Sequence, residues 1–233
     1  MRILAVGAHP DDLEILCAGT LAKFAQDGHH ITMCHVGKGD KGHFHIPNDE
    51  LAKIRRKEAQ LSASRIGAES VCLDLPDCEM FNDRPTLVLF IDLIRSARPD
   101  LIITHSPTDY MPDHQVVSRL VYDASFHATL PNFKTSLPAH DKVPPIYLMD
   151  SVAGVDFAPT EYVDISDFIE QKKEMMLCHQ SQVVWLKEHD NLDITDFIES
   201  IAKFRGIQCG VPYAEAFAVV NRWPRLRPQR LLP

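Results

Sequence analysis

The sequence predicts an α/β fold in which a mostly parallel sheet is flanked by helices. Short apolar runs alternate with segments of helical period along the first 130 residues, and this alternation is typical of a parallel sheet with right-handed crossovers. Hydrophobic residues make up 45% of the 233 residues, which is enough for a full core. Ionisable residues directly follow two of the apolar runs, at the edge of such a sheet where ligands bind.

The first two strand–helix pairs are expected at residues 3–8 with 13–26 and at residues 31–36 with 51–66. Each strand is an apolar run, and each helix carries apolar residues at helical spacing. A glycine follows each helix and predicts its end. Residues 40–49 contain two histidines and a proline, and we expect them to form a loop.

Two further pairs are expected at residues 71–75 with 86–97 and at residues 101–104 with 113–128. The repeated alternation implies that helices cover both faces of the sheet. The carboxyl ends of its parallel strands would therefore share one edge, where we expect the functional site.

Beyond Leu130 the pattern changes, and four prolines between residues 131 and 145 mark an irregular connection. We expect the whole chain, residues 1–233, to form one domain whose irregular part, residues 130–233, shapes the pocket and an oligomer surface. Within that part the patterns predict strands at residues 146–150 and 162–165, helices at 165–177 and 195–207, and a last edge strand at 216–220.

Composition excludes several classes of function. The formal net charge of −8 argues against nucleic acid as a partner, because phosphate binding needs clustered basic residues. No segment reaches the roughly 20 apolar residues of a membrane span, and the N-terminus does not resemble a signal peptide. The six cysteines are scattered without a C-x-x-C motif. We therefore expect free thiols in a reducing compartment, the cytoplasm.

The run from His9 to Asp12 places an imidazole and two adjacent carboxylates directly after a buried strand. Such groups are costly to desolvate unless they are paired or bound to a cation. His114, after a second apolar run, can complete a set of two imidazoles and one carboxylate with His9 and Asp12, which suits catalytic zinc. Asp11 is then free to act as general base on a metal-activated water.

Several of these residues also have simpler interpretations. Asp11 or Asp12 can cap the helix that follows. Asp113 can orient an imidazole as a hydrogen-bond acceptor, or cap the next helix. His105 can line the site, or be a histidine at a strand end with its hydrogen bonds satisfied. The sequence alone leaves these alternatives open.

At this point the motifs are recognisable. The run Ala8-His9-Pro10-Asp11-Asp12-Leu13-Glu14, followed by Ala18-Gly19-Thr20-Leu21, resembles the opening motif of the PIG-L/LmbE family of zinc-dependent N-deacetylases. Further resemblances span nearly the whole chain, at Arg55-Arg56-Lys57-Glu58-Ala59 with Ile66-Gly67, Pro112-Asp113-His114, Tyr162-Val163-Asp164-Ile165-Ser166, His179-Gln180-Ser181-Gln182 and Tyr213-Ala214-Glu215-Ala216-Phe217.

The resemblance implies a Rossmann-like sheet and hydrolysis of an N-acetyl group on an amino-sugar substrate such as an N-acetylglucosamine derivative. It implies zinc as the cofactor, with Fe²⁺ or another divalent metal as an alternative, and a homo-oligomer. It gives His9, Asp12 and His114 as metal ligands and Asp11 as the general base. Arg55 becomes a candidate for substrate binding; its alternative is a surface ion pair with Glu58 or Asp49.

Met111 departs from the family pattern. Many members have a histidine at this position of the second motif, where it is thought to assist the oxyanion or the leaving amine. A thioether donates neither a hydrogen bond nor a proton. Either the metal and Asp11 perform these tasks, or Tyr110 or His105 replaces the donor, or the protein acts on another acyl group or only weakly.

Two other functions compete with this interpretation. A set of two histidines and one carboxylate also serves non-haem Fe(II) oxygen chemistry, although those sites favour an all-β scaffold. The protein can also be a non-catalytic metal- or sugar-binding protein. A fourth ligand from His105 or His43 would favour that reading, because closed structural zinc sites have four protein ligands.

Overall fold

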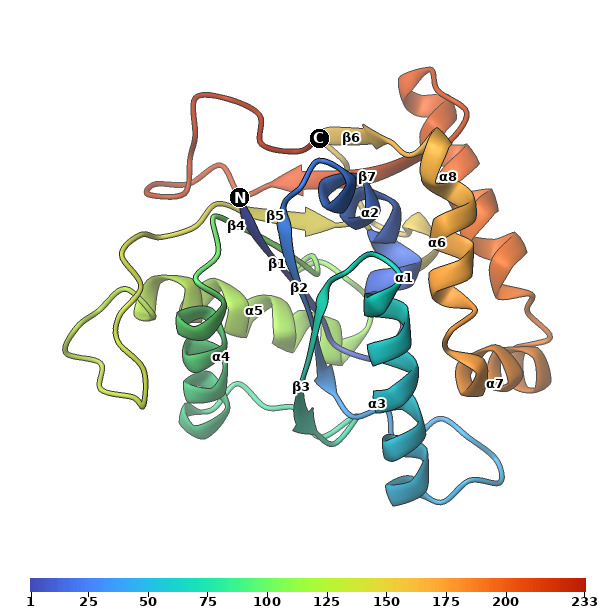
Figure 1. Cartoon of the computed structure of the whole chain (residues 1–233), viewed down its shortest axis with the longest axis horizontal. Coiled ribbons are helices and arrows are strands. Elements are labelled where there is room, and N and C mark those ends of the chain that lie inside the picture. Colours follow the sequence, from blue (N-terminus) through green and yellow to red (C-terminus); the bar gives the residue numbers. More distant parts are fainter.

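A computed structural model describes residues 1–233. Its centre is a seven-stranded sheet in the order β3-β2-β1-β4-β5-β7-β6, and helices cover both faces (Figure 1). The first five strands of that order are parallel, and β7 runs antiparallel to both of its neighbours. The strands are β1 (Arg2–Gly7), β2 (His30–Gly37), β3 (Glu69–Leu75), β4 (Leu101–Thr104), β5 (Ile146–Met149), β6 (Glu161–Asp164) and β7 (Ala214–Val219).

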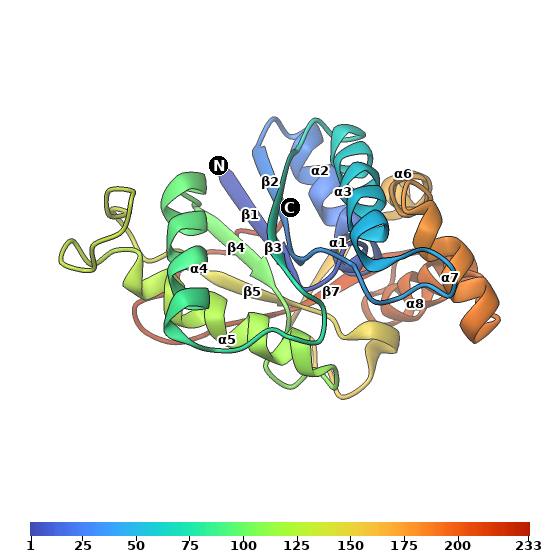
Figure 2. The same cartoon turned by 90° about the horizontal axis from the view of Figure 1, so that it is seen from below.

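Alternating residues of β1 supply the two sides of the core, because successive side chains of a strand point to opposite faces. Ile3 and Ala5 pack with the helices on one face, whereas Leu4 and Val6 pack with those on the other. The first face carries α1 (Asp12–Leu16), α2 (Ala18–Gln26), α3 (Asn48–Ser64), α6 (Ile169–Met176) and α8 (Ile194–Cys209), and the second carries α4 (Arg84–Ala97) and α5 (Pro112–His127), as Figure 2 shows.

The predicted α/β class and the mostly parallel sheet are confirmed. The first four strands and the helices at residues 51–66, 86–97 and 113–128 lie within a few residues of their expected places. The single helix expected at residues 13–26 was wrong, because the chain breaks at Cys17 into α1 and α2. Glu215 stabilises the break: its two carboxylate oxygens accept hydrogen bonds from the backbone N–H groups of Gly19 and Thr20 at 2.9 and 2.7 Å. These are the free donors of a new helix N-terminus.

The C-terminal part is more regular than expected. The strand expected at the sheet edge forms β7, but β7 lies between β5 and β6, so β6 is the edge strand. A helix that the sequence pattern did not predict, α7 (Gln180–Asp190), follows α6. The helix expected at residues 165–177 begins as a short 3-10 turn, η2 (Ser166–Phe168), before α6, and a second such turn, η1 (Val152–Gly154), follows β5.

All six cysteines are free. None of the helices combines the length and the apolar character that crossing a bilayer requires.

The helix α4 offers a simple test of these local assignments. Asp83 precedes it, and its carboxylate accepts a hydrogen bond of 2.9 Å from the backbone N–H of Thr86. We expect Asp83→Ala to lower the free energy of unfolding by about 1 kcal/mol, as loss of an N-cap does. Urea denaturation measures the change. Glu174→Ala, at an exposed position of α6, should alter stability by less than about 0.5 kcal/mol. Equal effects of the two substitutions would contradict the capping role.

Candidate metal centre

The candidate site lies where β1 and β4 end side by side. The chain leaves β1 toward β2 on one side and later returns to β4 on the other, so this is the switch point of the parallel sheet. Ligands of open α/β sheets bind at such points. The turn after β1 carries His9, Asp11 and Asp12, and the loop after β4 leads to His114 in the first turn of α5.

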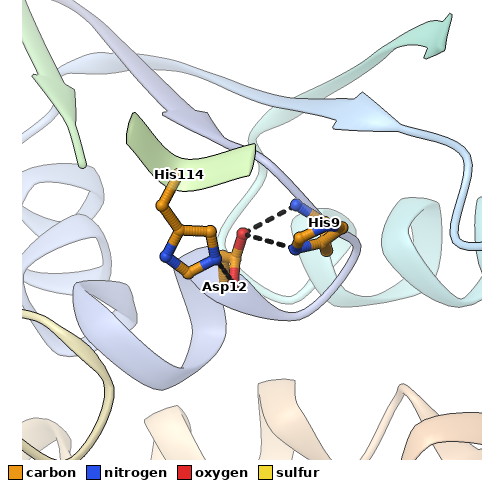
Figure 3. Close-up of side chains that lie close together, drawn as sticks. All are labelled: His9, Asp12 and His114. Carbon is orange, nitrogen blue, oxygen red and sulfur yellow. Dashed lines mark hydrogen bonds and ion pairs between the residues drawn. The ribbon is translucent and has the colours of Figure 1, made fainter. Parts of the chain in front are cut away.

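Three side chains from these two connections converge. Ligand atoms of His9, Asp12 and His114 all lie within 4.8 Å of one another, and Figure 3 shows the side chains pointing toward a common centre. Asp12 Oδ1 lies 3.2 Å from His114 Nε2, and Asp12 Oδ2 lies 3.7 Å from His9 Nδ1. The His9 backbone N–H donates to Asp12 Oδ2 at 2.6 Å, which fixes the carboxylate against the turn.

The far nitrogen of each imidazole contacts a carboxylate. His114 Nδ1 lies 3.0 Å from Asp109 Oδ2, and His9 Nε2 lies 3.0 Å from Asp113 Oδ2. Asp113 also accepts a 2.8 Å hydrogen bond from the backbone N–H of Cys78, and it makes no capping bond to α5. A carboxylate on the far nitrogen fixes the tautomer and orientation of a metal-ligating histidine. Both rings therefore present their other nitrogen to Asp12.

Asp109 was not among the residues singled out in the sequence. It is buried, and its Oδ1 accepts a hydrogen bond from the backbone N–H of Met111 at 2.9 Å. Burial disfavours the charged form of His114, but attraction by Asp12 and Asp109 outweighs it and raises the pKa of His114 to about 10. The sequence signal was an aspartate two residues before Met111, which nothing distinguished from an ordinary loop residue.

His105 lies behind the cluster and does not line the cavity. Its Nε2 accepts a hydrogen bond of 2.9 Å from the Ala8 backbone N–H, and burial lowers its pKa to about 4. The ring is therefore neutral, stacked on His114 with ring centroids 3.8 Å apart. Although the same nitrogen lies 3.2 Å from Asp12 Oδ2, it has no proton to donate there.

These contacts fit a divalent cation. His114 Nε2 is buried and, although it lies 3.2 Å from Asp12 Oδ1, the two atoms are not aligned for a hydrogen bond. Two imidazoles with one carboxylate are a usual donor set for catalytic zinc. A second possible grouping joins His105, Asp109 and His114. Its nitrogens at His105 and His114 already serve Ala8 and Asp109, and only the first grouping borders the cavity. His43, considered as a fourth ligand, accepts from two backbone N–H groups of its own loop instead.

Asp11 stands beside the cluster but outside it. Its backbone has φ of 128°, a strained value for a residue with a side chain. Asp11 occupies the N-cap position of α1, but its carboxylate makes no capping hydrogen bond there. Burial and the neighbouring Asp12 charge raise the pKa of Asp11 to about 7, against the attraction of Arg55 and His179. It can therefore exchange a proton near neutral pH.

Two helices far apart in the sequence surround Asp11. Arg55 of α3 is buried and donates to the Gly42 carbonyl at 2.8 Å and to the Gln182 side chain of α7. Glu58, one turn later, accepts from the Ser181 backbone N–H at 2.8 Å and from its hydroxyl at 2.6 Å. The surface ion pair considered for Arg55 is not formed. The Arg-x-x-Glu helix instead holds the start of α7.

A buried polar group behind Asp11 was also missed. Glu14 lies 3.2 Å from His179 Nε2 and 3.5 Å from His35 Nε2, and the Ser62 hydroxyl donates to it at 2.5 Å. Burial opposes its charge, but the two imidazoles hold the pKa of Glu14 well below its usual range. His179, whose pKa is raised, contributes positive charge behind Asp11. Glu14 lies in α1 and His179 directly precedes α7, so only the tertiary structure reveals that the two side chains are paired.

A cavity of about 610 Å³ opens above the cluster. His9, Asp11, Asp12 and Arg55 line it, so every candidate residue of the turn after β1 faces the same space as the arginine. The lining also includes Tyr110, Met111, Val152 and Ala153, apolar side chains of α7 and α8, and the charged side chains of Lys41, Asp77 and Asp190. Tyr110 is 50% exposed. A small molecule can therefore reach the groups that border the candidate metal centre.

The sequence profile of the GlcNAc-PI de-N-acetylase (PIG-L) family matches residues 4–125, which is more than half of the chain. The chain belongs to the PIG-L family. The match includes the turn after β1, the Arg55 helix and the first turn of α5, which are the segments that build the site.

Similar proteins include enzymes of two kinds. The PIG-L chain is 27% identical to a diacetylchitobiose deacetylase from Thermococcus kodakarensis, over 94% of this chain and 83% of that one. It is 25% identical to a 4-oxalmesaconate hydratase from Pseudomonas putida, over 88% and 80%. A solved N,N'-diacetylchitobiose deacetylase from Pyrococcus horikoshii matches with a TM-score of 0.82 and 27% identity, covering 94% of this chain and 83% of that chain. Enzyme activity is thus supported.

Proposed function

We propose that this protein is a metal-dependent N-deacetylase that removes an N-acetyl group, or a similar N-acyl group, from an amino-sugar-type small molecule. The observation that carries the proposal is the placement of Asp11, a carboxylate outside the three-residue cluster but in the lining of the same cavity. The deacetylase relatives favour the amide as the bond that is cleaved.

In this proposal His9, Asp12 and His114 hold a divalent cation, with zinc as the first choice and Fe²⁺ as an alternative. Such a cation supplies Lewis acidity, which polarises an amide carbonyl and makes water more acidic. Asp11 accepts the proton of the attacking water and then donates it to the leaving amine. Arg55, which borders the cavity beside Asp11, is the candidate for binding the substrate.

The charges that line the cavity favour a neutral substrate. Four carboxylates border it, from Asp11, Asp12, Asp77 and Asp190, against the two cations of Lys41 and Arg55. A bound divalent cation brings the formal sum to zero. A polycarboxylate substrate, as the name of the hydratase relative suggests for that enzyme, would then bring excess negative charge. An uncharged N-acetylated sugar adds none.

Tyr110 is our candidate for the hydrogen-bond donor that Met111 does not provide. Tyr110 borders the cavity, whereas His105 does not. Burial and the charge of Asp109 raise the pKa of Tyr110, so its hydroxyl keeps its proton at neutral pH. We expect Tyr110→Phe to reduce kcat by about tenfold while KM changes little, as for loss of one transition-state hydrogen bond. An unchanged kcat would exclude the hydroxyl.

The rate should fall on the acid side of neutrality. A general base works only when ionised, and Asp11 has a raised pKa of about 7 in the absence of metal. A nearby cation stabilises the carboxylate, so the acid limb of kcat/KM lies at or below pH 7, with a tenfold loss per pH unit below it. The profile is measured with metal kept saturating at every pH. A rate that stays constant from pH 8 down to 3.8, the ordinary pKa of an aspartate, would argue against Asp11.

The test is a deacetylation assay on protein freed of metal and then reconstituted separately with Zn²⁺ and Fe²⁺. Methyl N-acetylglucosaminide and diacetylchitobiose serve as substrates, with released amine as the readout and metal content measured on the same samples. We expect amine release only with metal. Sugar binding without amine release would identify a non-catalytic binding protein, and oxygen consumption by the Fe²⁺ form would identify oxygen chemistry; either result would refute the proposal.

A further inference from the structure

The cavity has a second side with different chemistry from the cluster. Beside the polar groups, apolar side chains of the lining come from α1, α7, the loop after α7 and α8. We call them the apolar wall: Ile15, Trp185, Leu186, Leu192, Ile194 and Phe197. The polar groups that α7 adds to the lining are Gln182, which is bonded to Arg55, Asp190 and the single indole N–H of Trp185. The wall therefore offers few hydrogen-bond partners to a ligand.

The apolar wall is backed by packed residues but keeps contact with solvent. Leu186, Leu192 and Phe197 pack against a small buried cluster formed by Met176, Ile194 and Ile198. Their own side chains are only half-buried. Covering such surface gains about 25 cal/mol per Å² of apolar area removed from water. An apolar group of a ligand that packs here gains this free energy without a rearrangement of the protein, because the wall is already formed.

Aromatic rings define the rim of the wall. Trp185 packs against Phe44 and His189, with ring centroids 4.6 and 4.4 Å apart. Phe44 belongs to the segment between β2 and α3 that also supplies Lys41 and Gly42 to the cavity lining. The rim therefore joins α7 to the segment whose Gly42 carbonyl accepts from Arg55. The wall and the polar groups border one continuous cavity.

We propose that the substrate carries, beside its amino-sugar unit, an alkyl or aryl group that packs on the apolar wall. This inference rests on the proposed deacetylation for the position of the amide. A second hydrophilic sugar is a poorer match, because its hydroxyl groups would lose water without gaining hydrogen-bond partners. The apolar group can be attached through the N-acyl chain or through the glycosidic oxygen.

Three substrates test the proposal: methyl N-acetyl-β-glucosaminide as reference, its hexyl glycoside, and the methyl glycoside with an N-hexanoyl group. We expect one of the two longer compounds to have a KM about tenfold or more below the reference, since several methylene groups leave water. Which compound gains identifies the point of attachment. A KM at or above the reference for both would overturn the proposal.

Two phenylalanines on α8 provide matched variants. Phe197 belongs to the apolar wall, whereas Phe204, two turns later, is 48% exposed and outside the cavity lining. Phe197→Ala should abolish most of the KM gain, and Phe204→Ala should retain it. Leu192→Ala is the second wall variant if Phe197→Ala does not fold. If the longer compound keeps its lower KM in both wall variants, the apolar wall is not the surface that binds its apolar group.

Binding without chemistry separates this proposal from the deacetylase proposal. Hexyl β-glucoside and methyl β-glucoside contain no amide, so calorimetric titration measures the apolar wall even if no amine is released from any substrate. Tighter binding of the hexyl compound that Phe197→Ala removes supports the wall independently of activity. Equal binding of the two glucosides, in a protein that does not turn over the amides, would overturn it.

Discussion

Replacing Asp11 with asparagine is expected to reduce turnover by about 10²–10⁴-fold, the usual contribution of a general acid–base group, while the protein keeps its metal. Asn preserves the shape of the side chain but cannot take a proton. It also tolerates a positive φ better than most residues, which matters at a position with φ of 128°. The ligand atoms of His9, Asp12 and His114 are untouched, so metal content should stay at the wild-type level.

Metal analysis and steady-state kinetics on the same preparation measure the two quantities. Asp27→Asn, an exposed position at the end of α2, is the control and should retain wild-type turnover. Thermal unfolding of the metal-free proteins shows whether the variant is folded, by comparison with the wild-type protein. Because the pKa of Asp11 is raised in the folded protein, its ionisation destabilises the fold as pH rises toward 7 and above. The variant should thus be at least as stable at pH 8. Wild-type turnover in a metal-loaded variant would remove Asp11 from the base role.

The residues next to strand ends could be placed from the sequence because local patterns fix them. The apolar run before His9 predicts β1, and the parallel arrangement brings its carboxyl end to that of β4. Their neighbouring ends put His114, from the α5 turn that follows β4, within reach of Asp12. His9 and Asp12 are close in the sequence, and the general rules for parallel α/β sheets bring the carboxyl ends of the strands to one edge.

The remainder depends on contacts between distant segments, which periodicity does not report. Glu215 breaks the expected first helix from 196 residues away in the sequence, and Gln182 meets Arg55 across 127 residues. Such pairings exist only once β7 has reached the start of α2 and α7 has packed on α3. The position of β7 inside the sheet also depends on contacts between segments that are distant in the sequence. Its apolar run predicts a strand but not its neighbours.

Removing the carboxylate of Asp109 is expected to weaken metal binding by about 10–100-fold, the usual effect of losing a partner that orients a ligand. Asp109 Oδ2 lies 3.0 Å from His114 Nδ1, inside the protein. In Asp109→Ala that nitrogen loses its partner, so the ring is free to adopt the other tautomer and Nε2 becomes a poorer donor to a cation. Asp109→Asn keeps a carbonyl oxygen that can accept from Nδ1. Its metal affinity should therefore lie between those of the wild-type protein and Asp109→Ala.

Competition with a chromophoric chelator measures the metal affinity of the three proteins, and turnover is compared at saturating metal. At saturating metal we expect Asp109→Ala to recover most of its kcat, because the substitution weakens binding of the cation but leaves Asp11 in place. Asp11→Asn should show the opposite result, with unchanged metal affinity and reduced turnover. Asp123→Ala removes a carboxylate of α5 that is paired with exposed Arg119, and it should change neither quantity. Wild-type metal affinity in Asp109→Ala would show that the ring of His114 is held by the rest of its burial, including its stacking on His105, and not by this hydrogen bond.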